Sequence, residues 1–234
     1  MSSRSSLLVA LHLLAGALPA FAGGLRGTLQ FPPSPRAAGA RPLAYWRLEN
    51  GVLPVGQAPV EPRRDVVIAL QPEKAPPPRA EGQTPPPVAL EAKPLRLEPR
   101  VAIAEVGATI VVKNTDRVPR TLYLKDGESF MPREATAPGG ERTVRFTVPG
   151  EYTLLDVDNP RAQSTVLVVP TRYLGRADER GAFAIDAPDG KYTLKAFYRG
   201  AWTDPVPVEI GGRARDVAVR LPARTGDAAT AGGR

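Results

Sequence analysis

Residues 101–112 read Val-Ala-Ile-Ala-Glu-Val-Gly-Ala-Thr-Ile-Val-Val, and residues 142–154 read Arg-Thr-Val-Arg-Phe-Thr-Val-Pro-Gly-Glu-Tyr-Thr-Leu. Both stretches are rich in β-branched and aromatic side chains, and their apolar residues alternate with polar ones or run together, which is typical of strands. Turn-forming residues separate them, namely Asn-Thr-Asp at 114–116 and Ala-Pro-Gly-Gly at 137–140. The segment 97–169 therefore predicts an all-β sandwich.

The same segment resembles the second half of a cupredoxin, the blue-copper domain. The resemblance rests on the order of its signals: an apolar strand with a central Gly107, the Asn-x-Asp turn at 114–116, a loop, and the run Gly-Glu-Arg-Thr-Val-Arg-Phe-Thr-Val-Pro-Gly-Glu-Tyr at 140–152. It implies a cupredoxin-like Greek key. It also implies where the copper ligands of the family would fall. Arg120 stands at the position of the first His, and Asp156 stands at the position of the Cys. Asn159 lies near the position of the second His, and Ala162 lies near that of the Met.

These residues cannot form a type-1 copper site, which needs a Cys thiolate and two His imidazoles. The chain contains no Cys, and its one His is His12, in the N-terminal leader. We therefore expect a domain that binds no cofactor, and an electron-transfer cupredoxin is the disfavoured interpretation.

Three oxygen-bearing residues, Asp156, Asp158 and Asn159, lie in the loop that holds the family's ligands. Because Ca²⁺ takes about six to eight oxygen ligands, a simple Asp/Asn-Pro turn is favoured over a cation site.

Residues 1–22 have the pattern of a secretory signal peptide: a positive charge at Arg4, an apolar core at 7–18 and the small-x-small cleavage signal Ala-Phe-Ala at 20–22. The apolar core is too short to span a membrane, and no later segment approaches the length of a spanning helix. We therefore expect an exported protein, periplasmic or extracellular, that is soluble once the leader has been removed.

A second family resemblance lies near the C-terminus. Residues 178–185 read Asp-Glu-Arg-Gly-Ala-Phe-Ala-Ile, and residues 188–194 read Pro-Asp-Gly-Lys-Tyr-Thr-Leu. This window resembles the carboxypeptidase regulatory-like, or transthyretin-like, module, which implies a second β-sandwich. Its glycines permit tight turns, and a period of two puts alternate side chains of each strand on an inward face. We expect strands at 173–174, 182–185, 192–198, 206–210 and 217–221.

The first strands of that module are missing before Asp178 and are found at the N-terminus instead, at 24–31 and 65–70. We infer that the regulatory-like sandwich is split around the cupredoxin-like one, with a plain tandem arrangement as the alternative. The intervening prolines cannot join a sheet because proline lacks the amide donor. The predicted organisation is a signal peptide (1–22), the N-terminal part of the regulatory-like sandwich (23–70), a Pro-rich linker (71–88), the cupredoxin-like domain (89–169), the C-terminal part of the regulatory-like sandwich (170–222) and a disordered tail (223–234).

The composition argues against several classes of function. The formal net charge of +7 is spread along the chain, with Arg63-Arg64 as its densest basic pair. Without a basic run or an aromatic platform, the sequence does not favour nucleic acid as a partner. Beyond the leader it has no imidazole base or thiol nucleophile, and it has no phosphate-loop or dinucleotide motif. We therefore do not expect an enzyme.

These observations predict a non-catalytic protein of two packed β-sandwiches that binds or scaffolds an envelope protein or a glycan. A carbohydrate-binding module is the alternative, because aromatic rings can stack on sugars. Trp202 is the favoured contact, since a large aromatic side chain in the turn-rich sequence at 199–204 is expected to be partly exposed. The full set of candidates is Trp202, Tyr198 and, in a strand expected at 43–48, Tyr45 and Trp46.

Overall fold

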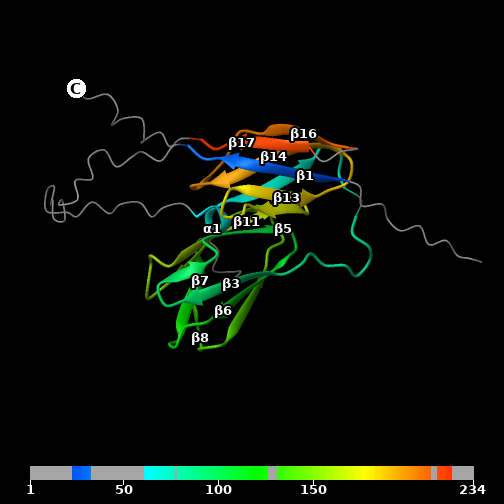
Figure 1. Ribbon diagram of the computed structural model, residues 1–234. Helices are drawn as coiled ribbons and strands as arrows, with labels where there is room; N and C mark the ends of the chain where they lie inside the picture. The colour runs from blue at the N-terminus through cyan, green and yellow to red at the C-terminus, as the bar shows by residue number, and fades with distance from the viewer. Residues whose placement is uncertain (1–22, 33–60, 77, 126–130, 212–214, 223–234) are drawn as a thin grey trace, which may run out of the picture.

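The computed structural model describes residues 23–32, 61–76, 78–125, 131–211 and 215–222. Within these residues the chain consists of β-strands and one short helix, α1 (Pro62–Asp65), so the all-β prediction is confirmed (Figure 1). In this described part, no helix has the length and apolar character needed to cross a membrane. The predicted signal peptide, the predicted strand with Tyr45 and Trp46, and the predicted tail lie outside the described residues.

The first sandwich combines strands from both ends of the described chain. Its strands are β1 (Gly24–Gln30), β2 (Val67–Pro72), β12 (Tyr173–Arg176), β13 (Ala182–Asp186), β14 (Gly190–Tyr198), β15 (Ala201–Trp202), β16 (Val206–Ile210) and β17 (Arg215–Arg220). One sheet has the order β13-β1-β17, in which β1 is antiparallel to β13 and parallel to β17. The other has the order β12-β2-β14-β15, and β16 also pairs with β14.

The core of the first sandwich lies between these two sheets. Alternation along each strand decides which residues enter it: on β1, Leu25 and Leu29 are buried, whereas Arg26 and Thr28 are exposed. The same period of two buries the residues that the sequence assigned to inward faces, Phe183, Ile185, Tyr192 and Leu194.

Two N-terminal strands occupy the middle of the first sandwich. Strand β1 lies between β13 and β17, and β2 lies between β12 and β14. Both end before residue 73, whereas the strands that they pair with all begin after residue 169. Strands from the two ends of the described chain thus share both sheets, which is the pairing that an interrupted domain requires.

A fragment that begins at Pro170 is expected to be unfolded, because it lacks the central strand of each sheet. The complementary chain, in which residues 88–169 are replaced by a short flexible linker, keeps every strand of the first sandwich and is expected to fold. Far-UV circular dichroism and thermal melting of the two proteins provide the measurement. A cooperative melt of the Pro170 fragment would contradict the split arrangement.

The second sandwich is formed by the segment between β2 and β12. Its strands are β3 (Val88–Lys93), β4 (Arg96–Glu98), β5 (Val101–Glu105), β6 (Thr109–Asn114), β7 (Arg120–Lys125), β8 (Glu134–Thr136), β9 (Glu141–Arg145), β10 (Gly150–Asp156) and β11 (Gln163–Val169). One sheet has the order β4-β3-β6-β9, and the other has the order β5-β11-β10-β7-β8. A core that includes Leu90, Ile110, Phe146 and Leu154 lies between them.

Two local features differ from the sequence prediction. The apolar segment 101–112 is not one strand: β5 and β6 belong to different sheets, and Gly107, with a φ of +85°, lies in the turn between them. Glycine adopts this positive φ without the steric penalty of a side chain. The helix α1 was not predicted, because four residues are too few to show a helical period, although a proline stands in its first turn, where proline is tolerated.

An apolar interface joins the two sandwiches. Its buried members are Val67, Ala69, Val101, Ile103, Leu167 and Phe197, with Val169, Leu174 and Trp202 packed at its margin. Strand β2 is therefore buried on both faces: Ile68 and Leu70 enter the core of the first sandwich, while Val67 and Ala69 pack in the interface. Burial on both faces explains why this strand reads as a continuous apolar run rather than an alternating one.

Candidate functional site

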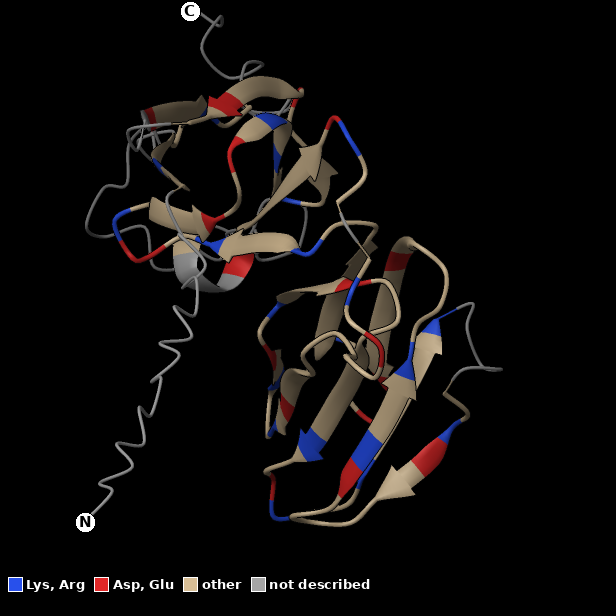
Figure 2. Cartoon of the chain, turned by 90° about the vertical axis from the view of Figure 1, so that its right-hand side faces the viewer, with Lys and Arg blue, Asp and Glu red and all other residues tan. Residues whose placement is uncertain are grey.

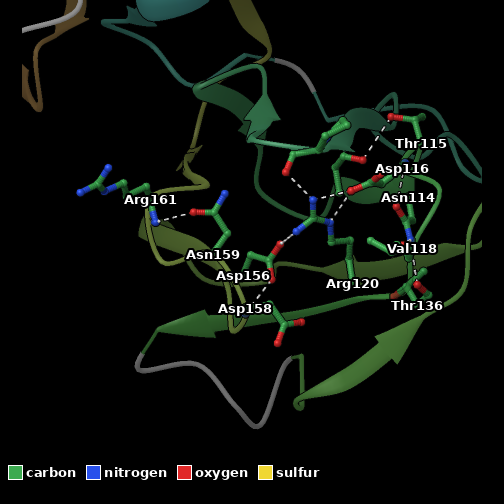
Figure 3. Close-up of polar contacts among 12 residues, drawn as sticks. Asn114, Thr115, Asp116, Val118, Arg120, Thr136, Asp156, Asp158, Asn159 and Arg161 are labelled. Carbon is green, nitrogen blue, oxygen red and sulfur yellow. Dashed lines mark hydrogen bonds and ion pairs between the residues drawn. The ribbon is translucent and has the colours of Figure 1, made fainter.

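Three connecting segments meet at one end of the second sandwich, which we call the loop end. They are the β3-β4 turn with Pro94, the β6-β7 loop with Asp116, and the end of β10 at Asp156. Strand β7 begins among them at Arg120, whose side chain points toward Asp116 and Asp156 (Figure 3). Arg120 and Asp156 are the residues that the cupredoxin resemblance placed at the first His and the Cys. The structure brings these two side chains into contact.

Arg120 is the centre of a buried network of ion pairs. Its Nη1 donates to Asp156 Oδ2 at 3.1 Å, and its Nε donates to Asp116 Oδ2 at 2.8 Å. Its Nη2 donates to the same oxygen of Asp116 and to the backbone carbonyl of Pro94. The side chains of Arg120, Asp116 and Asp156 are 9%, 8% and 2% exposed. The guanidinium group thus joins three segments that are remote in sequence.

Local turns hold the two carboxylates in place. Asn114 Nδ2 donates to two backbone carbonyl oxygens, at 2.9 and 2.8 Å, and its Oδ1 accepts a hydrogen bond from the Asp116 amide at 2.9 Å. Asp156 Oδ1 accepts from the Asp158 amide at 3.0 Å. In both turns a short polar side chain bonds to the backbone two residues further on. These turns therefore orient both carboxylates toward Arg120.

The surroundings of Asp116 favour its ionised form. Burial by itself raises the pKa of this carboxyl, but the hydrogen bond from the Arg117 amide, together with the hydrogen bond and the charge of Arg120, outweighs burial and lowers the pKa below its usual value. The Arg117 amide donates to Asp116 Oδ1 at 2.6 Å. Asp116 is therefore a carboxylate at neutral pH.

The residues of the loop end do not fit copper. A guanidinium group has no lone pair to donate to a metal, and Asp156 Oδ2 is directed at Arg120. The oxygen cluster considered from the sequence is not assembled around a common point either. Asn159 Oδ1 accepts from the Arg161 amide at 3.3 Å, and Asp158 is exposed. Within the described ranges, no group of three or more His, Cys, Asp or Glu residues is arranged to hold a metal ion.

The structure also places two of the aromatic residues that the sequence suggested for binding. Tyr198 is 3% exposed and lies in the core of the first sandwich, 5.9 Å from Phe31 between ring centroids. The expectation of an exposed stacking face at Tyr198 is thus corrected, because the period of two along β14 puts this ring on the inward face. Trp202 is half-buried at the margin of the interface, edge-on to Phe197 with 5.4 Å between centroids. Its contact with a partner stays a prediction.

The sequence did not reveal a group of exposed apolar side chains at the loop end. Leu95 is 79% exposed, Val118 is 51% exposed and Val157 is 41% exposed. Each lies next to, or two residues from, a residue that bonds to Arg120. The network takes the inward positions of these segments, which leaves their apolar neighbours in solvent. Single Leu and Val residues in loops show no periodic pattern, so only the folded arrangement makes the group visible.

The sequence matches no protein-family model and no curated protein. Solved structures that are similar to part of the chain are cupredoxins. A purple cupredoxin from Nitrosopumilus maritimus has 18% sequence identity and a TM-score of 0.32, with 35% of this chain and 99% of that chain covered. Plastocyanin from Dryopteris crassirhizoma has 10% identity and a TM-score of 0.32, with 35% and 100% covered. A mutant amicyanin has 18% identity and a TM-score of 0.31, with 44% and 98% covered.

Replacing Arg120 by Met is expected to lower the free energy of unfolding by about 3–5 kcal/mol, because the buried Asp156 carboxylate loses its cation. Replacing the whole network, by Arg120→Met with Asp116→Asn and Asp156→Leu, is expected to recover most of this loss, because no uncompensated buried charge remains. Urea unfolding of the parent and the two variants measures both effects. A loss below about 1 kcal/mol for Arg120→Met would show that the network behaves like an exposed ion pair.

The Asp116 carboxyl is expected to make stability depend on pH. Its pKa in the folded protein is lower than the value of about 3.9 in an unfolded chain, so its contribution is present above that pH and is lost as the pH falls through the folded pKa. The difference in free energy of unfolding between the parent and Asp116→Asn should be largest near neutral pH and shrink on acidification. Urea unfolding at a series of pH values measures this difference. A difference that stays constant down to about pH 2 would contradict the assignment.

Proposed function

We propose that the protein is an exported, non-catalytic β-sandwich protein that binds or scaffolds a partner protein in the cell envelope. In this proposal the second sandwich is a cupredoxin-like domain without copper ligands, and the first is a carboxypeptidase regulatory-like domain. One observation carries the proposal. The loop end is fixed by the buried Arg120 network and presents the exposed apolar side chains of Leu95, Val118 and Val157.

The loop end has the properties of a binding surface. Each of the three segments that meet at Arg120 presents one exposed apolar side chain, and exposed apolar surface is typical of sites that contact another molecule. The ion pairs beneath them restrict the loops, and a surface that is already ordered loses less conformational entropy when a partner binds. Asp116 and Asp156 are both engaged by Arg120, which disfavours a role for either as a general acid or base.

The distribution of charge supports a protein partner over nucleic acid. Figure 2 shows Lys and Arg interspersed with Asp and Glu along the strands and loops of both sandwiches, as on an ordinary solvated surface. A glycan partner is less well supported. In the described part of the chain, Tyr198 is buried and Trp202 packs edge-on to Phe197, so neither offers a flat, open ring face.

A photo-cross-linking amino acid at the loop end tests the proposal in cells that export the protein. Placed at Leu95 or Val157, it is expected to give a discrete adduct with one envelope protein. Val148 is the matched control: it is 53% exposed and precedes β10, whereas Val157 follows β10, so the two valines lie at opposite ends of one strand. No adduct is expected from position 148.

The purified complex provides the quantitative measurement. Val157→Ser is expected to weaken binding about tenfold or more, because it removes an apolar contact worth about 1.5–3 kcal/mol when buried. Val148→Ser should bind as the parent does, and both variants should melt at the temperature of the parent since both side chains are exposed. Equal cross-linking from positions 148 and 157 would remove the loop end as the binding surface.

A further inference from the structure

A groove of about 830 Å³ runs along the rim of the interface between the two sandwiches. One wall is formed by alternate residues of the β12 region, Arg172, Leu174 and Arg176, and the other includes Val88 of β3 and Ile103 of β5. Leu174 and Ile103 also belong to the apolar interface, so the floor of the groove continues that interface to the surface. None of the exposed apolar residues of the loop end lines the groove, although Lys93 and Glu98, on either side of the β3-β4 turn, do.

Arg176 has an unusual environment in this groove. Its Nη2 donates to the carbonyl of Val101 at 2.8 Å, but its Nη1 is buried and has no hydrogen-bond partner. No carboxylate among the described residues pairs with it, and burial lowers the pKa of its guanidinium group. A buried charge without a counter-ion is strongly destabilising, and buried polar atoms nearly always have partners. Arg176 Nη1 can therefore donate a hydrogen bond to an anion that the described residues do not supply.

The carboxylates that line the groove with Arg176 are already engaged. On the opposite wall, Glu98 pairs with Lys93 and with Arg96, the latter at 2.7 Å, and Glu91 lies 3.3 Å from the Lys93 ammonium. Beyond the end of β12, Asp178 Oδ1 accepts hydrogen bonds from the backbone of its own turn at 2.9 and 2.8 Å. Within the groove, no carboxylate is therefore left to pair with Arg176.

We propose that this groove binds an extended acidic segment of a partner protein, with an Asp or Glu carboxylate of that segment paired to Arg176 Nη1. Three features select a peptide. Strand β12 is the terminal strand of its sheet, so its outer edge can offer main-chain hydrogen bonds to an added strand. The floor at Leu174 and Ile103 suits an apolar neighbour of the acid. A guanidinium group pairs most strongly with a carboxylate, through charge-assisted hydrogen bonds. A scaffold would then have two separate surfaces.

The peptide Ac-Ser-Val-Glu-Val-Ser-NH2 tests the proposal, with its glutamine counterpart as the matched control. Titration of the full protein, followed by ¹⁵N NMR, is expected to shift the amide signals of 173–176 with a Kd about tenfold or more lower for the glutamate peptide. Arg176→Gln should abolish this preference, and Arg176→Lys should retain part of it, since Lys keeps the charge without the planar fork. Arg220→Gln, at an exposed arginine on β17, should bind as the parent does.

Several results would overturn the proposal: no shifts at 173–176, equal affinity for both peptides, or unchanged binding to Arg176→Gln and Arg176→Lys. Sodium acetate that shifts the same signals as strongly at equal concentration would show a site for small anions and would also overturn it. Far-UV circular dichroism confirms that each variant is folded. Because Val157 lies outside the groove, Val157→Ser should bind the peptide normally. A failed peptide test would therefore leave the loop-end proposal standing, and a failed loop-end test would leave the groove proposal standing.

Discussion

Burial of β2 on both faces is the constraint on which the rest of the structure depends. A strand that alternates between two apolar cores can only lie between them, so Val67 and Ala69 place the second sandwich against the first. Each fully buried aliphatic side chain contributes about 1.5–3 kcal/mol. The chain has no Cys, so no disulfide adds to that stabilisation. Two small sandwiches that would each expose an apolar sheet thus become one unit.

Two arginines, Arg120 and the half-buried Arg176, show opposite solutions to the same electrostatic problem. Arg120 sits among carboxylates and a carbonyl that satisfy its nitrogens, so it cross-links three segments much as a bound cation would, but with directional hydrogen bonds. Arg176 has one hydrogen bond to a carbonyl and no carboxylate among the described residues. The first arrangement is complete within the fold. The second is incomplete, and for that reason it points to a molecule outside the chain.

The parts of the fold that local patterns determine were predictable from the sequence. The two Gly-x-Tyr turns, at 150–152 and 190–192, are an example. The hydroxyls of Tyr152 and Tyr192 donate to carbonyl oxygens four residues upstream, at 3.0 and 2.8 Å, so similar sequences form the same contact in both sandwiches. What depends on segments remote in sequence was not predictable. The loop end is the example, because it required three segments to meet at Arg120. The inward position of Tyr198, by contrast, follows from the same period of two that buries Tyr192 and Leu194.

The parallel pairing of β1 with β17 has a mechanical consequence. The two strands are neighbours over six residue pairs, from Leu25 with Arg215 to Gln30 with Arg220. A tension that pulls on the chain ahead of Gly24 and beyond Arg220 acts on opposite ends of this pair, so it slides the strands past each other instead of peeling them apart. In this shear geometry the evenly spaced bonds of a parallel ladder share the load and must break together. The second sandwich lies outside the line of force, and a protein anchored at one end of its chain would keep its loop end intact while it is being pulled.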